Sequence, residues 1–167
     1  VLASSKSGVE DKVGVVGSPL LGKPAPAVRG TTFDDQTFDL ARRKGSWVVI
    51  NFFNTDCVGC IAEHGELVKF TEQQAAFDDG AELYSIDQPF DTEAKVKVFF
   101  AERGGTWPVI RDDVGAFSVA FGVAQLPETF IIDPDGIVRL RWAGSITADV
   151  LSNLVQQERD AYNAGAA

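Results

Sequence analysis

Hydrophobic positions in this chain fall into short runs separated by polar, glycine-rich or proline-rich segments. The run WVVINFFN at 47–54 is almost wholly apolar and rich in β-branched and aromatic residues, which is typical of a strand buried on both faces. AELYSID at 81–87 predicts a second buried strand, and ETFIID at 128–133 predicts a third. IVRLRWAG at 137–144 alternates apolar and basic residues, which indicates a half-exposed strand in an antiparallel pair.

Helical periodicity follows the first strand over residues 57–78. Six positions recur at steps of three and four, which places them on one core-facing stripe. This stripe consists of Cys60, Glu63, Leu67, Phe70, Gln74 and Phe77. Thr147 is the predicted N-cap of the last helix. The other predicted elements are a hairpin around Asp34–Asp35 at 28–40, a short extended segment at 107–112 and a turn at 133–136. Three further helices are predicted at 92–105, 114–123 and 147–162.

The order of these elements predicts the fold class. Strands that alternate with helices, followed by a hairpin and a last helix, are typical of a three-layer α/β domain. A length of 167 residues fits one domain with a sizeable core. Residues 1–26 are rich in glycine, serine and proline. We therefore expect a flexible lead-in at 1–20 and a single folded domain at 21–167.

The charge balance argues against two classes of partner. The net charge is −9, from 15 basic and 24 acidic side chains. We therefore expect no nucleic acid partner and no basic stripe for anionic lipid. No apolar stretch reaches the roughly 18 residues of a membrane span, and the start lacks the pattern of a secretory signal. Because the chain begins at Val1 and has no methionine, we expect that a signal or anchor has been removed.

The two cysteines, Cys57 and Cys60, lie in the segment NTDCVGC directly after the first strand. A Cys-x-x-Cys that follows a buried strand and begins a helix is a thioredoxin-like redox signature. The helix N-terminus stabilises a thiolate, and the spacing puts both sulfur atoms on one face. We expect Cys57 to be exposed and to attack a substrate disulfide. Cys60, shielded one turn later, would resolve the mixed disulfide.

Three other interpretations of the cysteine pair are weaker. A zinc site needs four ligands, and carboxylates or a second chain would have to complete a set of Cys57, Cys60 and His64. A structural disulfide across two residues would constrain little chain entropy. A lapsed redox site is disfavoured by the strand–CxxC–helix context. We expect His64 to be a satisfied neighbour of the stripe, and neither a metal nor another cofactor to bind.

Two further residues are predicted to complete the site. Glu63 lies on the buried stripe, so burial should raise its pKa and let it take and return the proton of Cys60. The alternative is a glutamate that reaches solvent at the edge of the stripe. Pro127 precedes a strand, where a cis bond would leave the backbone of Leu126 free to pair with an extended peptide. The alternative is a trans proline in an ordinary turn.

The segments PLLGKPAP, INFFNTDCVGCIAEH and FGVAQLPETFIIDPDGIVRLRWAG resemble the extracytoplasmic thioredoxin-like reductases of cytochrome c maturation. This is the DsbE/CcmG type within the TlpA-like group, and the resemblance runs from about Leu20 to Gly144. Glu63 matches the buried glutamate of that family, and Pro127 matches its cis proline. The resemblance implies a thioredoxin fold with added N-terminal strands and a central insert, for which the 66 residues between Cys60 and Pro127 leave room.

The resemblance also implies a function. It implies a monomeric thiol–disulfide oxidoreductase that keeps the haem-binding cysteines of apocytochrome c reduced and takes electrons from a membrane thiol transporter. The client would bind at Val58, Gly59, Leu126 and Pro127. A non-catalytic module that binds an extended peptide or apocytochrome on the same scaffold is the alternative. A peroxidatic thiol is weaker, because that chemistry favours a threonine and an arginine around a single cysteine of low pKa.

The chain departs from the family pattern on both sides of the first cysteine. The family usually has tryptophan at the position of Asp56 and proline within the dipeptide that is Val58–Gly59 here. A nearby anion would raise the pKa of Cys57 and make the dithiol a stronger reductant. The alternative role for Asp56 is to cap the helix N-terminus. Gly59 should loosen the first helical turn.

Overall fold

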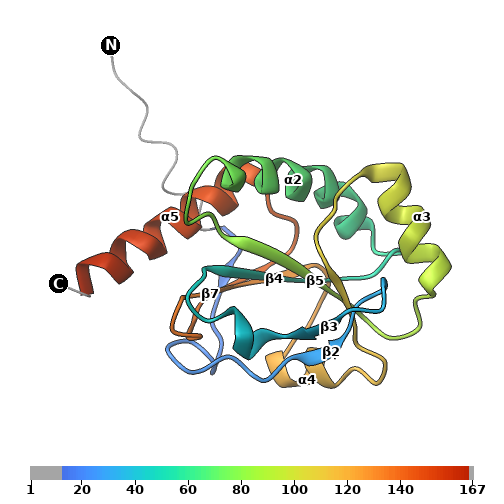
Figure 1. Cartoon of the computed structure of the whole chain (residues 1–167), viewed down its shortest axis with the longest axis horizontal. Helices are drawn as coiled ribbons and strands as arrows, with labels where there is room; N and C mark the ends of the chain where they lie inside the picture. The colour runs from blue at the N-terminus through green and yellow to red at the C-terminus, as the bar shows by residue number, and fades with distance from the viewer. Residues whose placement is uncertain (1–12, 166–167) are drawn as a thin grey trace, which may run out of the picture.

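A six-stranded mixed sheet forms the centre of the computed structural model, which describes residues 13–165 (Figure 1). Its middle strand, β4, has a parallel neighbour in β5 and an antiparallel neighbour in β7. In the order β1-β8-β7-β4-β5-β6, the strands span Val15–Val16, Val138–Ala143, Glu128–Ile132, Val48–Phe53, Glu82–Asp87 and Val109–Arg111. All six residues of β4 are buried, as its apolar run predicts.

Helices cover one face of the sheet, and a hairpin with two short helices covers the other. Figure 1 shows α2 and α3 above the sheet, with α4, β2 and β3 below it. The first layer contains α2, α3 and α5, at Val58–Ala75, Glu93–Arg103 and Ala148–Gly165. The second contains β2, β3, η1 and α4, at Arg29–Thr31, Thr37–Asp39, Leu40–Arg43 and Ala116–Phe121. The predicted three-layer α/β fold is confirmed.

Each face of the sheet has its own hydrophobic core. On the first face, Leu67 and Phe70 of α2 pack with Leu151 of α5 over Val49. On the other face, residues of the hairpin, η1 and α4 pack over alternate residues of β4, as the two-residue period of a strand requires. The elements between β5 and β7, namely α3, β6 and α4, fill the position of the expected central insert.

The end of α2 corrects one prediction. The helix ends at Ala75, and Phe77, the last predicted member of the core-facing stripe, is 51% exposed. Its backbone N–H bonds Gln74 O, and its carbonyl accepts from Gly80 N, so the chain turns away before another helical turn forms. The side chain of Gln74 accepts from Ala81 N at 3.0 Å and ties this turn to β5.

The N-terminal part of the described chain joins the main sheet. Val15–Val16 pairs antiparallel with β8, where Val15 lies opposite Trp142. Gly14 lies so close to the Trp142 indole that any Cβ there would overlap the ring. Within the predicted flexible lead-in, Val15–Val16 therefore belong to the sheet, and residues 1–12 of that lead-in lie outside the described residues.

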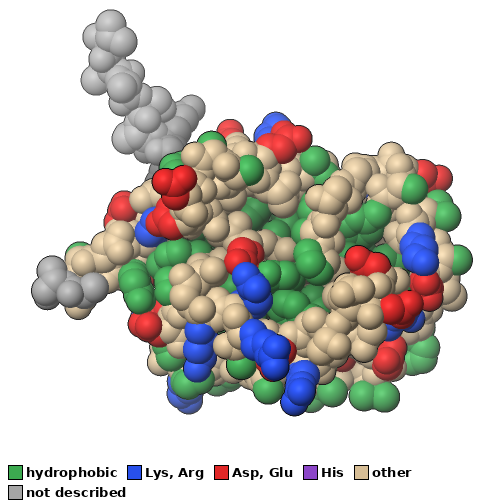
Figure 2. All heavy atoms as spheres, in the orientation of Figure 1, with side chains coloured by type: hydrophobic (Ala, Val, Ile, Leu, Met, Phe, Trp, Pro, Cys, Tyr) green, Lys and Arg blue, Asp and Glu red, His purple; other side chains and the backbone are tan. Residues whose placement is uncertain are grey.

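Charged side chains of both signs are interspersed on the face shown in Figure 2, with the basic ones more numerous in its lower half. Within residues 13–165, no helix combines the length and the apolar character that crossing a membrane requires.

Candidate active site at the Cys57–Cys60 disulfide

Cys57 and Cys60 lie where the central strand, β4, passes into helix α2 of the first layer. Cys57 is the N-cap of α2, and its sulfur accepts a hydrogen bond from Cys60 N at 3.1 Å. A disulfide joins the two residues. Cys60 is only 3% exposed, as predicted, whereas Cys57 is half-buried rather than fully exposed. The helix dipole and the unpaired N–H groups therefore favour a thiolate at the more accessible sulfur.

Leu126 and Pro127 approach the cysteines from the opposite side of the site. Their peptide bond is cis, as predicted. A Cβ built on Gly59 would lie 3.0 Å from Pro127 Cδ, so the two backbones meet because Gly59 has no side chain. The Gly59 carbonyl also accepts from Ser145 Oγ at 2.8 Å. Gly59 therefore permits close packing at this point of the site.

The side chain of Leu126 is packed, whereas its backbone is free to form hydrogen bonds. The side chain packs beside Cys57 in a cluster that also contains Phe53 and Phe99. Its backbone N–H and C=O make no hydrogen bond within residues 13–165. An extended peptide could therefore pair with it, as in β-strand addition. Val58, between the cysteines, is 83% exposed.

Glu63 is buried beneath the disulfide, one helical turn beyond Cys60. It is 2% exposed, which is incompatible with the alternative of a side chain that reaches solvent. Asn51 Nδ2 donates to Glu63 Oε2 at 3.1 Å, and Ile146 N donates to Oε1 at 3.1 Å. Burial outweighs these two bonds and raises the pKa of Glu63 to about 8. The group can therefore gain or lose a proton near neutral pH.

Asn51 is a site residue that the sequence reasoning missed. It lies in the middle of β4, is 1% exposed and bonds Glu63. Its Oδ1 accepts from Ser85 Oγ at 3.3 Å, and Ser85 Oγ in turn accepts from Trp107 Nε1 at 2.9 Å. The sequence signal that could have identified it is one polar residue inside an otherwise apolar run. Because a buried amide needs hydrogen-bond partners, such a residue indicates a polar contact within the core.

Asp56 does not cap the N-terminus of α2, so the alternative role predicted for this residue is wrong. Its side chain is 78% exposed, and Cys57 caps α2 instead. The Asp56 carboxylate accepts from Lys95 Nζ at 2.8 Å, so a cation from α3 lies beside the anion. The sequence reasoning missed Lys95. Its charge opposes the expected effect of Asp56 on the thiolate of Cys57.

A pair of acidic residues holds the loop that precedes Cys57, and the sequence reasoning missed it. Asp91 accepts from Thr55 N at 2.8 Å and from Thr55 Oγ1 at 2.6 Å. Asp87, at the end of β5, is 3% exposed, and burial together with its hydrogen bond to Asp91 raises its pKa to about 9. With this pKa, Asp87 is protonated at neutral pH and can donate a hydrogen bond to the carboxyl group of Asp91.

His64 is satisfied, as predicted, but it is fully buried. Its Nε2 lies 2.7 Å from Gly104 O, and its ring is packed by three aromatic rings with centroids within 5.0 Å, those of Phe99, Phe100 and Trp107. Burial lowers the pKa of His64. No group of three histidine, cysteine, aspartate or glutamate side chains suited to a metal occurs among residues 13–165.

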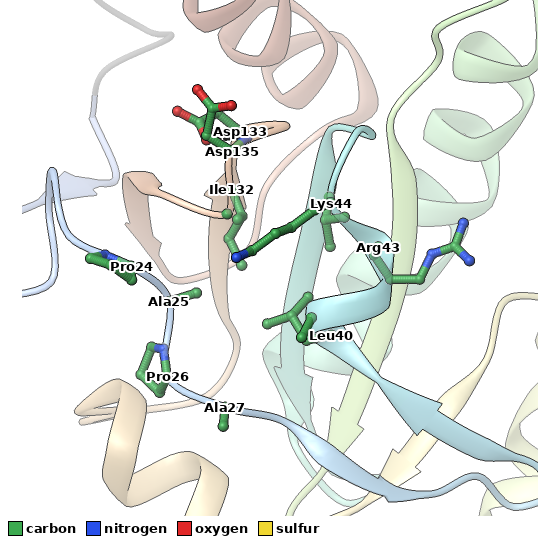
Figure 3. Close-up of a pocket in the computed structure, with 13 residues that line it drawn as sticks. Pro24, Ala25, Pro26, Ala27, Leu40, Arg43, Lys44, Ile132, Asp133 and Asp135 are labelled. Carbon is green, nitrogen blue, oxygen red and sulfur yellow. Dashed lines mark hydrogen bonds between the residues drawn. The ribbon is translucent and has the colours of Figure 1, made fainter.

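A separate cavity of about 210 Å³ lies away from this site. It is lined by Val48, the first residue of β4, whereas the cysteines follow the last residue of that strand. Figure 3 shows Lys44 reaching across the cavity toward the segment 24–27. Its walls are mostly apolar, and neither cysteine lines it.

The fold and the site together define a thiol–disulfide oxidoreductase with a thioredoxin fold: a CxxC disulfide begins the helix after the central strand, opposite a cis proline. Residues 21–141 match the AhpC/TSA family, and the chain belongs to that family.

Named relatives agree with this assignment, and a solved structure shares the fold. The chain is 32% identical to the thiol:disulfide interchange protein DsbE of Haemophilus influenzae, over 80% of this chain and 71% of that protein. It is also 32% identical to the thiol:disulfide interchange protein HelX of Rhodobacter capsulatus, over 81% and 75%. A crystal structure of a DsbF homologue from Corynebacterium diphtheriae shares the fold, with a TM-score of 0.73, 19% identity, and coverage of 94% and 98%.

Proposed function

We propose that this enzyme is an extracytoplasmic reductant of protein disulfides, with apocytochrome c as a client. The observation that carries the proposal is the unequal burial of one disulfide: Cys57 is half-buried at the helix tip, and Cys60 is 3% exposed behind it. The resemblance of the chain to extracytoplasmic thioredoxin-like reductases supports the location. The resemblance to cytochrome c maturation reductases supports the client.

The proposed reaction has two exchange steps. The Cys57 thiolate attacks one sulfur of the client disulfide, and the other client sulfur leaves as a thiolate that takes up a proton. Cys60 then loses its proton and attacks Cys57, which releases the second client sulfur as a thiol and forms the Cys57–Cys60 disulfide. The client gains two electrons and the enzyme loses two. A membrane thiol-electron donor would reduce the enzyme again.

Glu63 is the proposed proton acceptor of the second step. It shares the helix face of Cys60, and its pKa of about 8 keeps both protonation states accessible near neutral pH. Asn51 and the backbone of Ile146 fix the carboxyl group while it exchanges the proton.

Trapping of the mixed disulfide tests the proposed roles of Cys57 as the attacking thiol and Cys60 as the resolving thiol. A Cys60→Ser variant should accumulate a covalent complex with a cystine-containing client, because the resolving thiol is missing. A Cys57→Ser variant should neither form that complex nor reduce insulin disulfides. Equal trapping by both variants, or a wild-type enzyme without reductase activity, would contradict the proposal.

The unpaired backbone of Leu126 favours a second candidate, a peptide-binding module in which the cysteines do not react. The same assay separates the two candidates when a Cys57→Ser/Cys60→Ser double variant is added. Capture of the client by the double variant, together with an inactive wild type, would favour the binding module.

A further inference from the structure

The loop between β5 and α3 exposes one aromatic side chain in an unfavourable backbone conformation. Phe90 is fully exposed (101%), and its φ is 80°. This left-handed conformation is unfavourable for a residue with a bulky side chain, and full exposure gives a phenyl ring no compensating burial. The surrounding contacts must therefore hold Phe90 in this position.

Hydrogen bonds fix the chain on both sides of Phe90. Before it, Gln88 N donates to Phe53 O at 3.0 Å, at the end of the central strand. After it, the Asp91 carboxylate accepts the two hydrogen bonds from Thr55. Thr92 then caps α3 by accepting from Lys95 N at 3.1 Å. The loop is thus attached to the segment that leads into Cys57.

Strand topology places this loop beside the reactive disulfide. β4 and β5 are parallel, and Phe53 lies opposite Asp87 at their carboxyl ends. The loop into Cys57 and the loop with Phe90 therefore leave the sheet at the same edge, on the side of α3 in Figure 1. Thr55 and Asp56 also line an open cavity of about 340 Å³ with Val98, which is itself 53% exposed.

We propose that Phe90 contacts an apolar side chain close to the cystine of a client polypeptide. This inference rests on the proposed function. A mixed disulfide at Cys57 necessarily brings the residues that flank the client cysteine over the adjoining surface. That surface carries Val58 as well as Phe90, both without apolar neighbours that cover them. Covering Phe90 with a client side chain gives the burial that the free enzyme lacks. Phe90 is thereby a specificity-determining residue for this reaction.

Two synthetic cystine peptides test the inference. They differ only in the residue that precedes each cysteine, which is leucine in one and serine in the other. The wild type should reduce the leucine peptide with a kcat/KM about 10-fold higher than the serine peptide. Phe90→Asn should remove that preference, since asparagine accepts the left-handed conformation but has no apolar surface. Phe90→Tyr should retain it.

Controls separate recognition from chemistry and folding. Val119→Asn replaces another exposed apolar residue, 81% exposed on α4 at the opposite face of the sheet, and should keep the preference. The Phe90→Asn variant should keep the wild-type reduction potential and should unfold at a urea concentration no lower than the wild type does.

The outcomes distinguish this inference from the proposed function. A wild type that reduces neither peptide contradicts the proposed function. A wild type that reduces both peptides equally, or a Phe90→Asn variant that keeps the preference, overturns only the inference. Self-association of the wild type that Phe90→Asn abolishes would assign the surface to a second copy of the chain and would also overturn it.

Discussion

Single polar residues beneath the disulfide set the chemistry of the site. Glu63 would be an ordinary surface acid if its helix face were exposed, but α2 packs that face against β4 and the segment that precedes α5. Asn51 and Ile146 supply fixed donors without compensating for the lost water, so the pKa of Glu63 lies at about 8. One buried carboxyl group can therefore exchange protons where free glutamate is fully ionised.

Glu63→Gln should slow the resolution step while keeping the shape and the hydrogen-bonding capacity of the side chain. We expect the single-turnover rate at neutral pH to fall by about 100-fold, which is typical for the loss of a general base. In the wild type that rate should rise as the pH increases through about 8, because the carboxylate is the proton acceptor. The variant should lack this rise.

Glu72→Gln is the matched control for that experiment, since Glu72 is exposed on the same helix. It should leave both the rate and the pH profile unchanged. A Glu63→Gln variant with wild-type resolution kinetics would show that another group accepts the proton.

Asp56 and Lys95 should act on Cys57 in opposite directions. Removal of the cation in Lys95→Met should raise the Cys57 pKa, because the Asp56 charge is then unopposed. Asp56→Asn should lower it by a similar amount, and the double variant should return close to the wild-type value. Thiolate absorbance of the reduced protein, followed against pH, measures the three shifts.

Lys97→Met serves as the control, because Lys97 lies only two residues further along α3 and pairs with Glu93 rather than with Asp56. A Cys57 pKa that shifts equally in Lys95→Met and Lys97→Met would indicate only a general charge effect.

At the scale of elements, α2 connects the redox site to both neighbouring helices. Its first turn carries the cysteines, and its buried face packs against α5. On its other side, His64 bonds the carbonyl of Gly104, the C-cap of α3. Movement of α3 would therefore displace the helix that holds the disulfide as well as Lys95.

His64 should make the fold sensitive to acid. Burial lowers its pKa in the folded chain, so its contribution to stability is present above the unfolded-state pKa of 6.5 and is lost as the pH falls below it. Glu63 acts in the opposite sense over the same range, so a variant is needed to isolate the effect. His64→Gln should weaken the fall in unfolding free energy between about pH 6.5 and 5.

NMR provides a direct check, because His64 is the only histidine in the chain. Its imidazole resonance should titrate below pH 6.5 in the folded protein. A normal or raised value would contradict burial as the dominant effect.

Local patterns predicted the elements and the residues whose roles follow from spacing. Cys57, Cys60 and Glu63 were identifiable because helical periodicity relates them, and Pro127 because it directly precedes a buried strand. The contact of Lys95 with Asp56 and the bonds of Asp91 to Thr55 were not, since they join polar residues that lie far apart in the sequence. No periodicity marks such contacts.

The wrong predictions have the same physical origin. The stripe of α2 was extended one step too far because the sequence does not show where Gln74 turns back to bond Ala81. The prediction that Asp56 caps α2 failed because the sequence does not show that Cys57 takes the N-cap position and that Asp56 turns to Lys95.

At the scale of the whole molecule, three separate segments meet at one edge of the sheet. They are the loop into Cys57, the loop that carries Phe90, and the segment that ends at Pro127. The third is held from behind by a buried ion pair: Arg141 Nη2 donates to Glu128 at 2.7 Å and to Gly122 O at 3.1 Å. The two bonds fix both ends of the segment.

Arg141→Met should destabilise the fold by about 3–5 kcal/mol, because it leaves the buried carboxyl group of Glu128 without its cation. The added variant Glu128→Gln should recover part of that loss. Urea unfolding measures both effects, with Arg42→Met, at an exposed pair, as the control. A loss below about 1 kcal/mol in Arg141→Met would mean that the pair is not needed to hold this segment.

The reduction potential of the Cys57–Cys60 couple tests the central claim most directly. Equilibration with glutathione or dithiothreitol buffers, with the fraction of free thiols read by alkylation, gives the value. A reductant of protein disulfides should lie closer to the ~−270 mV of thioredoxin than to the ~−120 mV of a strong oxidant. A potential near that of the strong oxidant would contradict the account, because the couple would then donate disulfides rather than remove them.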